Sequence, residues 1–537
     1  MKVMMTLNIL FSVITCLLIL FLWKRKEKTK EFRYYHIIIL LLALVFLFLL
    51  TYKLGSVPRG LHVDEAGMAY DAFNLVKYGV DRFLYPNPVY FINFGGGQNA
   101  LYTYLAAFMI KIFGYSITMI RIPAVLLSIL SAFFLAFMVK KEKGKLASGI
   151  ILFLLCVLPF SIMHSRWALE SYLLFPMSII SIFCLYQAFS KRKKIWFLLS
   201  GLSFGFTLYT YAIAYLILPI FLAVILIYAI IQKKISCSEF FCLAIPLSIL
   251  AFPLILMLLV NNEIIPEIVT PILSIPKMLV YRGSEFSLSN INNNWFLLSV
   301  LFSYDGLIYN SFPQFGTMYY FSIPLCLYGF ILAVKNIVKV VKKKEISLDF
   351  IIFIFFISTY LVAITLEVPN INRINAIYFP FIYFTSLGIC SLISKSNWSI
   401  FLILAMYLIM FSLFFYTYYI EYPKKVHDTC YFVSQDNLED AITFANRQHK
   451  DKVYILDEDK YQPYIYTVLA LRMDLYTFNK EKVMDNTSVI QLDNYYFRLD
   501  DIEEDNIYIF LKEDKIPKKF DKNKFSCKKF GSIIVYY

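Results

Sequence analysis

Charged residues are scarce in this 537-residue chain, of which only 16% are Asp, Glu, Lys or Arg. A soluble globular protein carries about 25% charged and roughly 45–50% apolar residues, whereas 59% of this chain is hydrophobic. The composition therefore excludes a soluble enzyme, a disordered chain, a coiled coil and a disulfide-rich secreted scaffold. The apolar residues gather in long uninterrupted runs, which predict a polytopic α-helical membrane protein.

Histidine and cysteine are also few, with five and nine copies, and they form no cluster with metal-ligand spacing. All cysteines except Cys430 and Cys527 lie in or beside apolar runs, where they are typical small packing residues. Those two flank the C-terminal segment, and the sequence does not decide whether they pair. We expect no cofactor, although the acidic pair Asp64-Glu65 leaves a divalent metal open.

The apolar runs predict about twelve membrane-spanning helices, since one span takes about 20 residues. Basic clusters occupy alternate connections between the runs, beginning with Lys24 to Arg33 and Lys140 to Lys145. The positive-inside rule places these connections in the cytoplasm, and the intervening loops and both termini outside. The expected spans lie near residues 7–23, 36–54, 119–139, 146–163, 172–189, 195–210, 212–231, 240–260, 318–334, 349–366, 374–393 and 399–417.

The formal net charge of +14 indicates a lipid surface rather than nucleic acid as the partner. The basic clusters lie between apolar runs, where they meet anionic lipid headgroups. Residues 418–537 carry 18 basic and 21 acidic residues, so the positive excess belongs to the membrane part. The expected partners are therefore the bilayer of the cell membrane and a substrate, with no nucleic acid.

Three parts follow from this pattern. Residues 1–35 are expected to form an N-terminal anchor helix and a basic cytoplasmic loop, because the charges follow the first apolar run as in an uncleaved anchor. Residues 36–417 form a transmembrane module with long outer loops at about 55–118 and 261–318. Residues 418–537 form a small extracytoplasmic α/β domain, with a helix over Gln435 to His449 and strands at Lys452 to Leu456, Asn506 to Leu511 and Ser532 to Tyr537.

The densest group of polar residues lies in the first outer loop, as His62-Val63-Asp64-Glu65-Ala66-Gly67-Met68-Ala69-Tyr70. An enzyme that takes a sugar from a lipid phosphate needs one carboxylate to remove the proton of the acceptor hydroxyl. The leaving phosphate needs no second acid, unlike the leaving group in a glycosidase. Asp64 also suits a helix N-cap, and the two interpretations are compatible.

Neighbouring helical residues point about 100° apart, so Asp64 and Glu65 are expected to have separate roles. We predict that Asp64 is the general base and that Glu65 orients the acceptor or pairs a cation. His62, Tyr70, Arg82 and Gln98 are the predicted substrate-binding residues of this loop.

A second group of candidates comes from later loops. Arg166 is predicted to clamp a phosphate or to pair with Glu170, four residues on. Arg373, next to Asn372, is a phosphate candidate because arginine is rare in outer loops, with snorkelling to headgroups as the alternative. Further substrate-binding candidates are Glu170, Asn372, Asn310 and Asp305, and Asp305 also reads as a turn residue before Gly306.

These features together resemble the GT-C membrane glycosyltransferases, especially glycosyltransferase family 39, which includes protein O-mannosyltransferases and lipid A aminoarabinose transferases. The resemblance covers roughly residues 36–420. It rests on Asp64-Glu65, an interfacial aromatic segment over Gln98 to Gly114, the Arg121-Ile122-Pro123 entry into a span, and Ser165-Arg166-Trp167-Ala168. It implies a polyprenyl-phosphate-linked sugar donor, inversion at the anomeric carbon, Asp64 as catalytic carboxylate and no metal requirement.

One position departs from the family. Several relatives carry a lysine that holds phosphate near the start of the interfacial segment, where this chain has Gln98. Phosphate binding is then left to Arg166, Arg373, Arg82 or Arg59. We expect transfer to an envelope acceptor, whether protein, glycolipid or wall polymer, on the outer face of the cell membrane. The alternatives are a flippase for a lipid-linked glycan and a glycan polymerase or ligase.

Overall fold

The computed structural model describes residues 2–28, 34–280, 286–425, 432–457, 463–485, 488–499, 501–513 and 516–537. The chain divides into two compact units. The first comprises Met1–Tyr52, Ala124–Leu254 and Gly283–Tyr416, and the second comprises Lys53–Pro123, Ile255–Arg282 and Thr417–Tyr537. Cys430 lies outside the described residues, as does any pairing it makes with Cys527.

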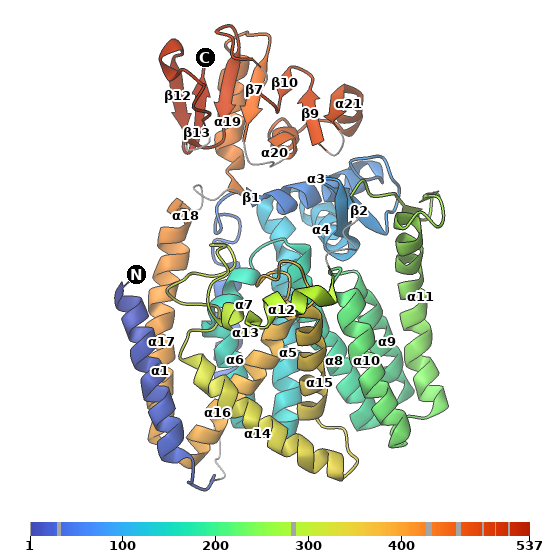
Figure 1. Ribbon diagram of the computed structural model, residues 1–537, viewed down its shortest axis with the longest axis vertical. Helices are drawn as coiled ribbons and strands as arrows, with labels where there is room; N and C mark the ends of the chain where they lie inside the picture. Colours follow the sequence, from blue (N-terminus) through green and yellow to red (C-terminus); the bar gives the residue numbers. More distant parts are fainter. Residues whose placement is uncertain are drawn as a thin grey trace. The chain divides into compact units, whose positions relative to one another are not determined.

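The first unit is a bundle of apolar helices (Figure 1). Two further helices, α5 (Ile117–Lys143) and α11 (Cys237–Asn261), belong partly to each unit. The helices of the first unit are α1 (Lys2–Leu22), α2 (Tyr35–Thr51), α6 (Lys145–Val157), α7 (Pro159–His164), α8 (Leu174–Lys191), α9 (Lys194–Leu208), α10 (Ala214–Ile231), α12 (Ile291–Asn294), α13 (Leu297–Phe302), α14 (Ser322–Lys342), α15 (Leu348–Ala363), α16 (Tyr378–Lys395) and α17 (Trp398–Tyr416), with short 3₁₀ turns η1 (Glu170–Leu173), η3 (Leu288–Asn290) and η4 (Asn375–Ile377).

Among the described residues, eight helices are long and apolar enough to cross a membrane, and five shorter apolar helices accompany them. Each of the twelve predicted spans coincides with one of these thirteen helices. The remaining one is α4 (Ala100–Phe113), which falls in the predicted interfacial segment. The predicted polytopic helical membrane fold is confirmed.

Close backbone contact holds the bundle where small residues allow it. Helices α14 and α16 meet at Gly329, where an added Cβ would lie 1.7 Å from the carbonyl oxygen of Phe384. Apolar side chains gain little by association in lipid, so helices there rely on such close packing. Helices α1 and α17 also run side by side in this unit (Figure 1).

The second unit contains the first long loop and the C-terminal segment. Its first part has β1 (Leu61–His62), α3 (Val63–Tyr78), the hairpin β2 (Tyr90–Asn93) and β3 (Gly96–Asn99), α4, β4 (Ile268–Val269) and β5 (Ser274–Ile275). The C-terminal part begins with a π-helical turn, η5 (Thr417–Glu421), and α18 (Tyr422–Lys425). Then follow β6 (Phe432–Val433), α19 (Gln435–Asn446), β7 (Val453–Leu456), α20 (Pro463–Ala470), α21 (Leu475–Glu481), β8 (Lys482–Asp485), β9 (Ser488–Leu492), β10 (Tyr495–Tyr496), β11 (Ile507–Phe510), η8 (Lys522–Lys524), β12 (Cys527–Phe530) and β13 (Ile533–Tyr536).

The C-terminal segment is built on a mixed seven-stranded sheet in the order β12-β13-β11-β7-β10-β9-β8. β7 pairs in parallel with β10 and β11, and the other pairs are antiparallel. The predicted helix and the three predicted strands correspond to α19, β7, β11 and β13. The predicted small C-terminal α/β domain is thus confirmed.

Candidate functional site

The acidic pair lies at the start of α3, where the sequence places a helix cap. The N-cap is His62, whose Nδ1 accepts the amide of Asp64 at 3.1 Å. Burial lowers the pKa of His62 more than the charges of Asp64 and Glu65 raise it, so the neutral imidazole serves as the acceptor. The Glu65 carboxylate accepts the His62 amide at 2.9 Å, which completes a capping box.

Glu65 is fully buried and forms an ion pair with Arg121 at the start of α5. Its two carboxylate oxygens accept from Nε and one terminal nitrogen of Arg121, both at 2.9 Å. The guanidinium also donates to the carbonyl groups of Leu54, Pro58 and Gly60. Of the two predicted roles for Glu65, the structure shows cation pairing, and its carboxylate is inaccessible to an acceptor.

Asp71 and Arg82 form a second buried pair. The Arg82 Nε donates to Asp71 Oδ1 at 2.9 Å, and a terminal nitrogen donates to Oδ2 at 2.7 Å. The remaining donors of Arg82 reach Asn93 Oδ1 at 3.1 Å and the Tyr464 hydroxyl at 3.2 Å. This guanidinium is 0% exposed, and its donors are held by protein acceptors.

Asp64 differs from the other three acidic residues of 53–123, which are Glu65, Asp71 and Asp81. Its side chain is 44% exposed, whereas those of Glu65 and Asp71 are 0% and 1% exposed. Asn93 Nδ2 donates to its Oδ1 at 3.5 Å. The helix N-terminus beside it favours a negative charge. Among the four acidic residues of 53–123, Asp64 therefore has the accessible carboxylate.

Three other predicted residues of the loop have structural contacts. His62 is 4% exposed and caps α3. Tyr70 is 2% exposed, packs edge-on against Phe478 and donates to the carbonyl group of Met473. Gln98 is 3% exposed on β3, opposite Phe91. All three side chains are therefore buried in the structure.

Arg166 is also buried, in the first unit. Its terminal nitrogens donate to the carbonyl groups of Leu49, Leu50 and Tyr52, at 2.7, 2.8 and 2.7 Å. These carbonyl groups end α2, where a cation satisfies unpaired acceptors and the helix dipole. The helix that the predicted Arg166–Glu170 spacing requires is absent, because α7 ends at His164 and η1 begins at Glu170.

The remaining predicted site residues of the first unit are Asp305, Asn310, Asn372 and Arg373. Asp305 Oδ2 accepts from Asn310 at 2.6 Å and from the amide of Ile371 at 3.0 Å, and burial raises the pKa of Asp305. Asn310 is 1% exposed, so Asp305 and Asn310 fix the loop, as the turn interpretation predicted. Asn372 accepts from Ser171 at 2.6 Å. Arg373 is partly exposed.

Asp81 adds a titrating group beside Arg82. It is 1% exposed, and its Oδ1 accepts the amides of Phe83 and Tyr85, both at 2.9 Å. Its Oδ2 has no hydrogen-bond partner among the residues that the structure describes. Burial and then the Asp71 carboxylate raise the pKa of Asp81.

The raised pKa of Asp81 predicts that the stability of the surrounding loop depends on pH. A carboxyl group with a raised pKa in the folded state contributes stability that is complete below about pH 3.9 and is lost as pH rises through the folded pKa. One such proton changes the free energy of unfolding by about 1.4 kcal/mol per pH unit. We expect hydrogen exchange of residues 79–89, corrected for intrinsic rates, to accelerate with pH in the wild type and much less in Asp81→Asn. The same pH dependence in both proteins would contradict this assignment.

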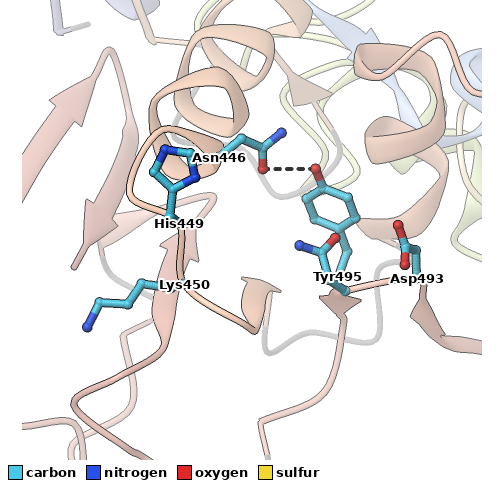
Figure 2. A pocket seen from close by; sticks show the side chains of 6 residues that line it. Asn446, His449, Lys450, Asp493 and Tyr495 are labelled. Atoms are coloured by element: carbon cyan, nitrogen blue, oxygen red, sulfur yellow. Dashed lines mark hydrogen bonds between the residues drawn. The ribbon is translucent and has the colours of Figure 1, made fainter.

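A polar hollow of about 590 Å³ lies in the C-terminal part, lined by Asn446, His449, Lys450, Asp493, Asn494 and Tyr495 (Figure 2). The Tyr495 hydroxyl donates to Asn446 Oδ1 at 3.0 Å, and this bond ties α19 to β10. None of the predicted site residues lines the hollow. It is therefore separate from the site around Asp64.

Comparison with known proteins identifies the type of fold. Residues 99–258 match the dolichyl-phosphate-mannose-protein mannosyltransferase family. A crystal structure of ArnT from Cupriavidus metallidurans bound to undecaprenyl phosphate superimposes with a TM-score of 0.54 at 10% identity, covering 94% of this chain and 97% of that chain. The chain has the GT-C fold. The resemblance to GT-C glycosyltransferases inferred from the sequence is confirmed.

Other matches are weaker. The Archaeoglobus fulgidus oligosaccharyltransferase in the apo form gives a TM-score of 0.47 at 10% identity and covers 82% of this chain and 64% of that chain. No curated protein matches the chain by sequence. The family match and the GT-C fold support glycosyl transfer by a multi-pass membrane protein.

Proposed function

We propose that the protein transfers a sugar from a polyprenyl-phosphate donor to an acceptor hydroxyl on the outer face of the cytoplasmic membrane, with Asp64 as general base. The observation that carries the proposal is the exposure of Asp64, at 44%, among buried and paired carboxylates. The ArnT structure with bound undecaprenyl phosphate supports a lipid-phosphate donor. The C-terminal domain then lies outside the cell, as its acidic composition and the basic inner loops favour.

In the proposed reaction, an Asp64 carboxylate oxygen takes the proton of the acceptor hydroxyl. The hydroxyl oxygen attacks the anomeric carbon while the bond from that carbon to the phosphate oxygen breaks. The electron pair of that bond leaves with the polyprenyl phosphate, and the anomeric centre inverts. The phosphate is a good leaving group, so this chemistry requires neither a second carboxylic acid nor a metal.

The donor phosphate still needs a cation to bind it. The four candidate arginines differ in burial, since two are buried and two are accessible to solvent. Arg82 and Arg166 are 0% exposed, with guanidinium groups occupied by protein acceptors. Arg59 is exposed and Arg373 is partly exposed. We propose that Arg59 or Arg373 binds the donor phosphate, because charge-assisted hydrogen bonds need an accessible guanidinium.

Removing the arginine that binds the phosphate should weaken donor binding. A hydrogen bond to a charged group is worth roughly 1.5–3 kcal/mol, which corresponds to a donor KM about 10–100-fold higher in whichever of Arg59→Ala and Arg373→Ala removes that contact. Steady-state kinetics over a range of donor concentrations measures this effect. Lys111→Ala removes an exposed charge from α4 and controls for general attraction to anionic lipid. An unchanged donor KM would remove that arginine from the site.

The proposal is tested with purified protein in vesicles that hold candidate acceptors and a radiolabelled sugar, linked in separate samples to polyprenyl phosphate or to polyprenyl pyrophosphate. Label that moves from lipid to acceptor supports transfer, and the labelled fraction identifies the acceptor class. Label that crosses the bilayer while still on lipid would instead establish a flippase. Label that moves only from pyrophosphate donors into a growing glycan would establish a polymerase or ligase. A parallel sample with a metal chelator tests metal dependence, and loss of transfer there would contradict metal-free chemistry.

A further inference from the structure

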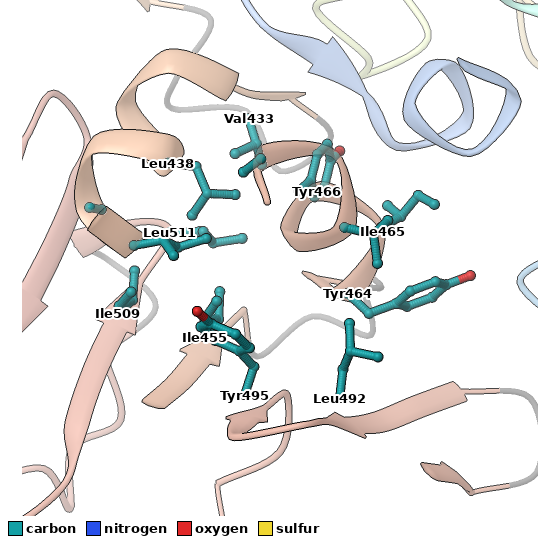
Figure 3. Packing of buried hydrophobic residues seen from close by; sticks show 14 of the residues in the cluster. Val433, Leu438, Ile455, Tyr464, Ile465, Tyr466, Leu492, Tyr495, Ile509 and Leu511 are labelled. Carbon is teal, nitrogen blue, oxygen red and sulfur yellow. The ribbon is translucent and has the colours of Figure 1, made fainter. Parts of the chain in front are cut away.

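The helix that carries Asp64 shares a hydrophobic core with the C-terminal part of the second unit. Strand β1, directly before α3, pairs with β6 through Leu61 opposite Val433. Helix α20 packs against α3. The shared core includes Leu61, Val63, Ala66 and Tyr70 of the first loop and Phe478 of the C-terminal part. Its other C-terminal members include Val433, Leu438, Ile455, Tyr464, Ile465, Leu492 and Ile509 (Figure 3).

Tyr464 is the member of this core that has a polar link to the site. Its side chain is 2% exposed, and Figure 3 shows its ring extending away from Ile455, with the hydroxyl at the far end. That hydroxyl accepts from Arg82 at 3.2 Å. A second link from the C-terminal part reinforces the first, because Asn479 donates to the Arg82 carbonyl group at 3.0 Å.

Arg82 connects Tyr464 to Asp64 through Asn93. The Asp71 carboxylate fixes one edge of the guanidinium, and Tyr464 fixes a further terminal nitrogen. The guanidinium donates to Asn93 Oδ1 at 3.1 Å, and Asn93 donates to Asp64 Oδ1 at 3.5 Å. A planar group held at several donors cannot tilt, so Asn93 presents its amide to Asp64 in a set direction.

Asn93 and Arg82 pack closely against α3 at Gly67. An added Cβ at Gly67, three residues after Asp64 on α3, would lie 2.5 Å from Asn93 Oδ1 and 2.7 Å from a terminal nitrogen of Arg82. Asn93 and Arg82 therefore lie directly against the helix that carries the base. Catalytic groups need such support, since they must be held within about 0.5 Å of their working geometry.

We propose that Tyr464 is a positioning residue, through which the C-terminal domain orients the carboxylate of Asp64 by way of Arg82 and Asn93. This inference rests on the proposed role of Asp64 as base. It assigns the C-terminal domain a part in the chemical step, separate from any part in choosing the acceptor. Tyr464 does not touch the substrate, because its hydroxyl is buried against Arg82.

The test compares full-length Tyr464→Phe with the wild type in vesicles. Because a small misplacement of a reacting group costs up to about 100-fold in rate, we expect kcat to fall about tenfold with the donor KM unchanged within about twofold. Tyr495→Phe is the matched control, since it also removes a buried tyrosine hydroxyl from this core and breaks the bond to Asn446 that Figure 2 shows. We expect Tyr495→Phe to keep its kcat.

A second variant separates positioning from folding. Asn93→Ala leaves the C-terminal domain unaltered and should reproduce the tenfold fall in kcat. The double variant Tyr464→Phe/Asn93→Ala should be no slower than either single variant, because both act through one chain of contacts. An unchanged kcat in Asn93→Ala, multiplied effects in the double variant, or an equal fall in Tyr495→Phe would overturn the proposal.

The same assay with Asp64→Asn distinguishes this inference from the proposed function. An inactive Asp64→Asn beside a fully active Tyr464→Phe would leave the base in place and overturn only the positioning role. A fully active Asp64→Asn would overturn the proposed function itself.

Discussion

Replacing Asp64 with asparagine should lower kcat by about 10²–10⁴-fold, the range that general base catalysis supplies. The amide keeps the size of the side chain and its place at the N-terminus of α3 but cannot take the acceptor proton. Asp64 is 44% exposed, and its carboxylate contact at 3.5 Å, with His62 Nδ1, involves a neutral imidazole, so the substitution should leave the fold intact. Single-turnover transfer from a labelled lipid donor measures the chemical step directly.

The control for this experiment is another exposed carboxylate of the second unit. Glu263 is 74% exposed and pairs with Lys277, so Glu263→Gln removes a similar charge outside the proposed site. We expect wild-type kcat in that variant. A well-folded Asp64→Asn protein that transfers sugar at the wild-type rate would show that Asp64 is not the base.

Breaking the Glu65–Arg121 pair should have the largest effect on stability. Both side chains are 0% exposed, so Glu65→Gln leaves an arginine charge buried without its carboxylate. Removing one partner of a buried pair costs about 3–5 kcal/mol. Thermal unfolding in detergent and hydrogen exchange over residues 54–65 should both report the loss.

Two further variants show whether the lost stability of Glu65→Gln comes from the unpaired charge of Arg121. Arg121→Leu should destabilise the protein about as much as Glu65→Gln, whereas the double variant Glu65→Leu/Arg121→Leu should recover part of the stability, since apolar groups replace buried pairs at little cost. A Glu65→Gln protein with wild-type stability and no activity would contradict the structural role and place Glu65 in the reaction.

Much of the membrane fold was predictable, because each span leaves a local signal. A run of about 20 apolar residues specifies a span without reference to the rest of the chain. The same holds for β7, β11 and β13, whose strand-like runs are short and apolar. Helix α4 likewise matched the segment expected to form a helix outside the spans.

The partners of the arginine residues were not predictable, because each pairing is set by tertiary structure. Arg121 marked the family resemblance, yet nothing local indicates that it pairs with Glu65, 56 positions earlier. Arg166 follows the end of α7 at His164 and donates to carbonyl groups at the end of α2, more than 100 positions earlier in the chain. The link from Arg82 to Tyr464 spans 382 positions. Burial, which the sequence alone does not report, decides which arginine side chains are accessible.

The same reasoning explains why Asp64 could be singled out as a candidate base from the sequence. Its place beside a helix start and next to a second carboxylate is visible in the sequence, and the capping box His62-Val63-Asp64-Glu65 forms locally. The Asp64 side chain is accessible, whereas Glu65 is buried against Arg121. This difference depends on the position of Arg121, which only the structure gives.

The most direct test of the central claim counts products in vesicles that contain the purified protein and a doubly labelled donor, with one label on the sugar and one on the polyprenyl phosphate. The account predicts one polyprenyl phosphate released for each sugar transferred in the wild type, and neither product above background in Asp64→Asn. Sugar that crosses the membrane still joined to its lipid, at equal rates in both proteins, would contradict it.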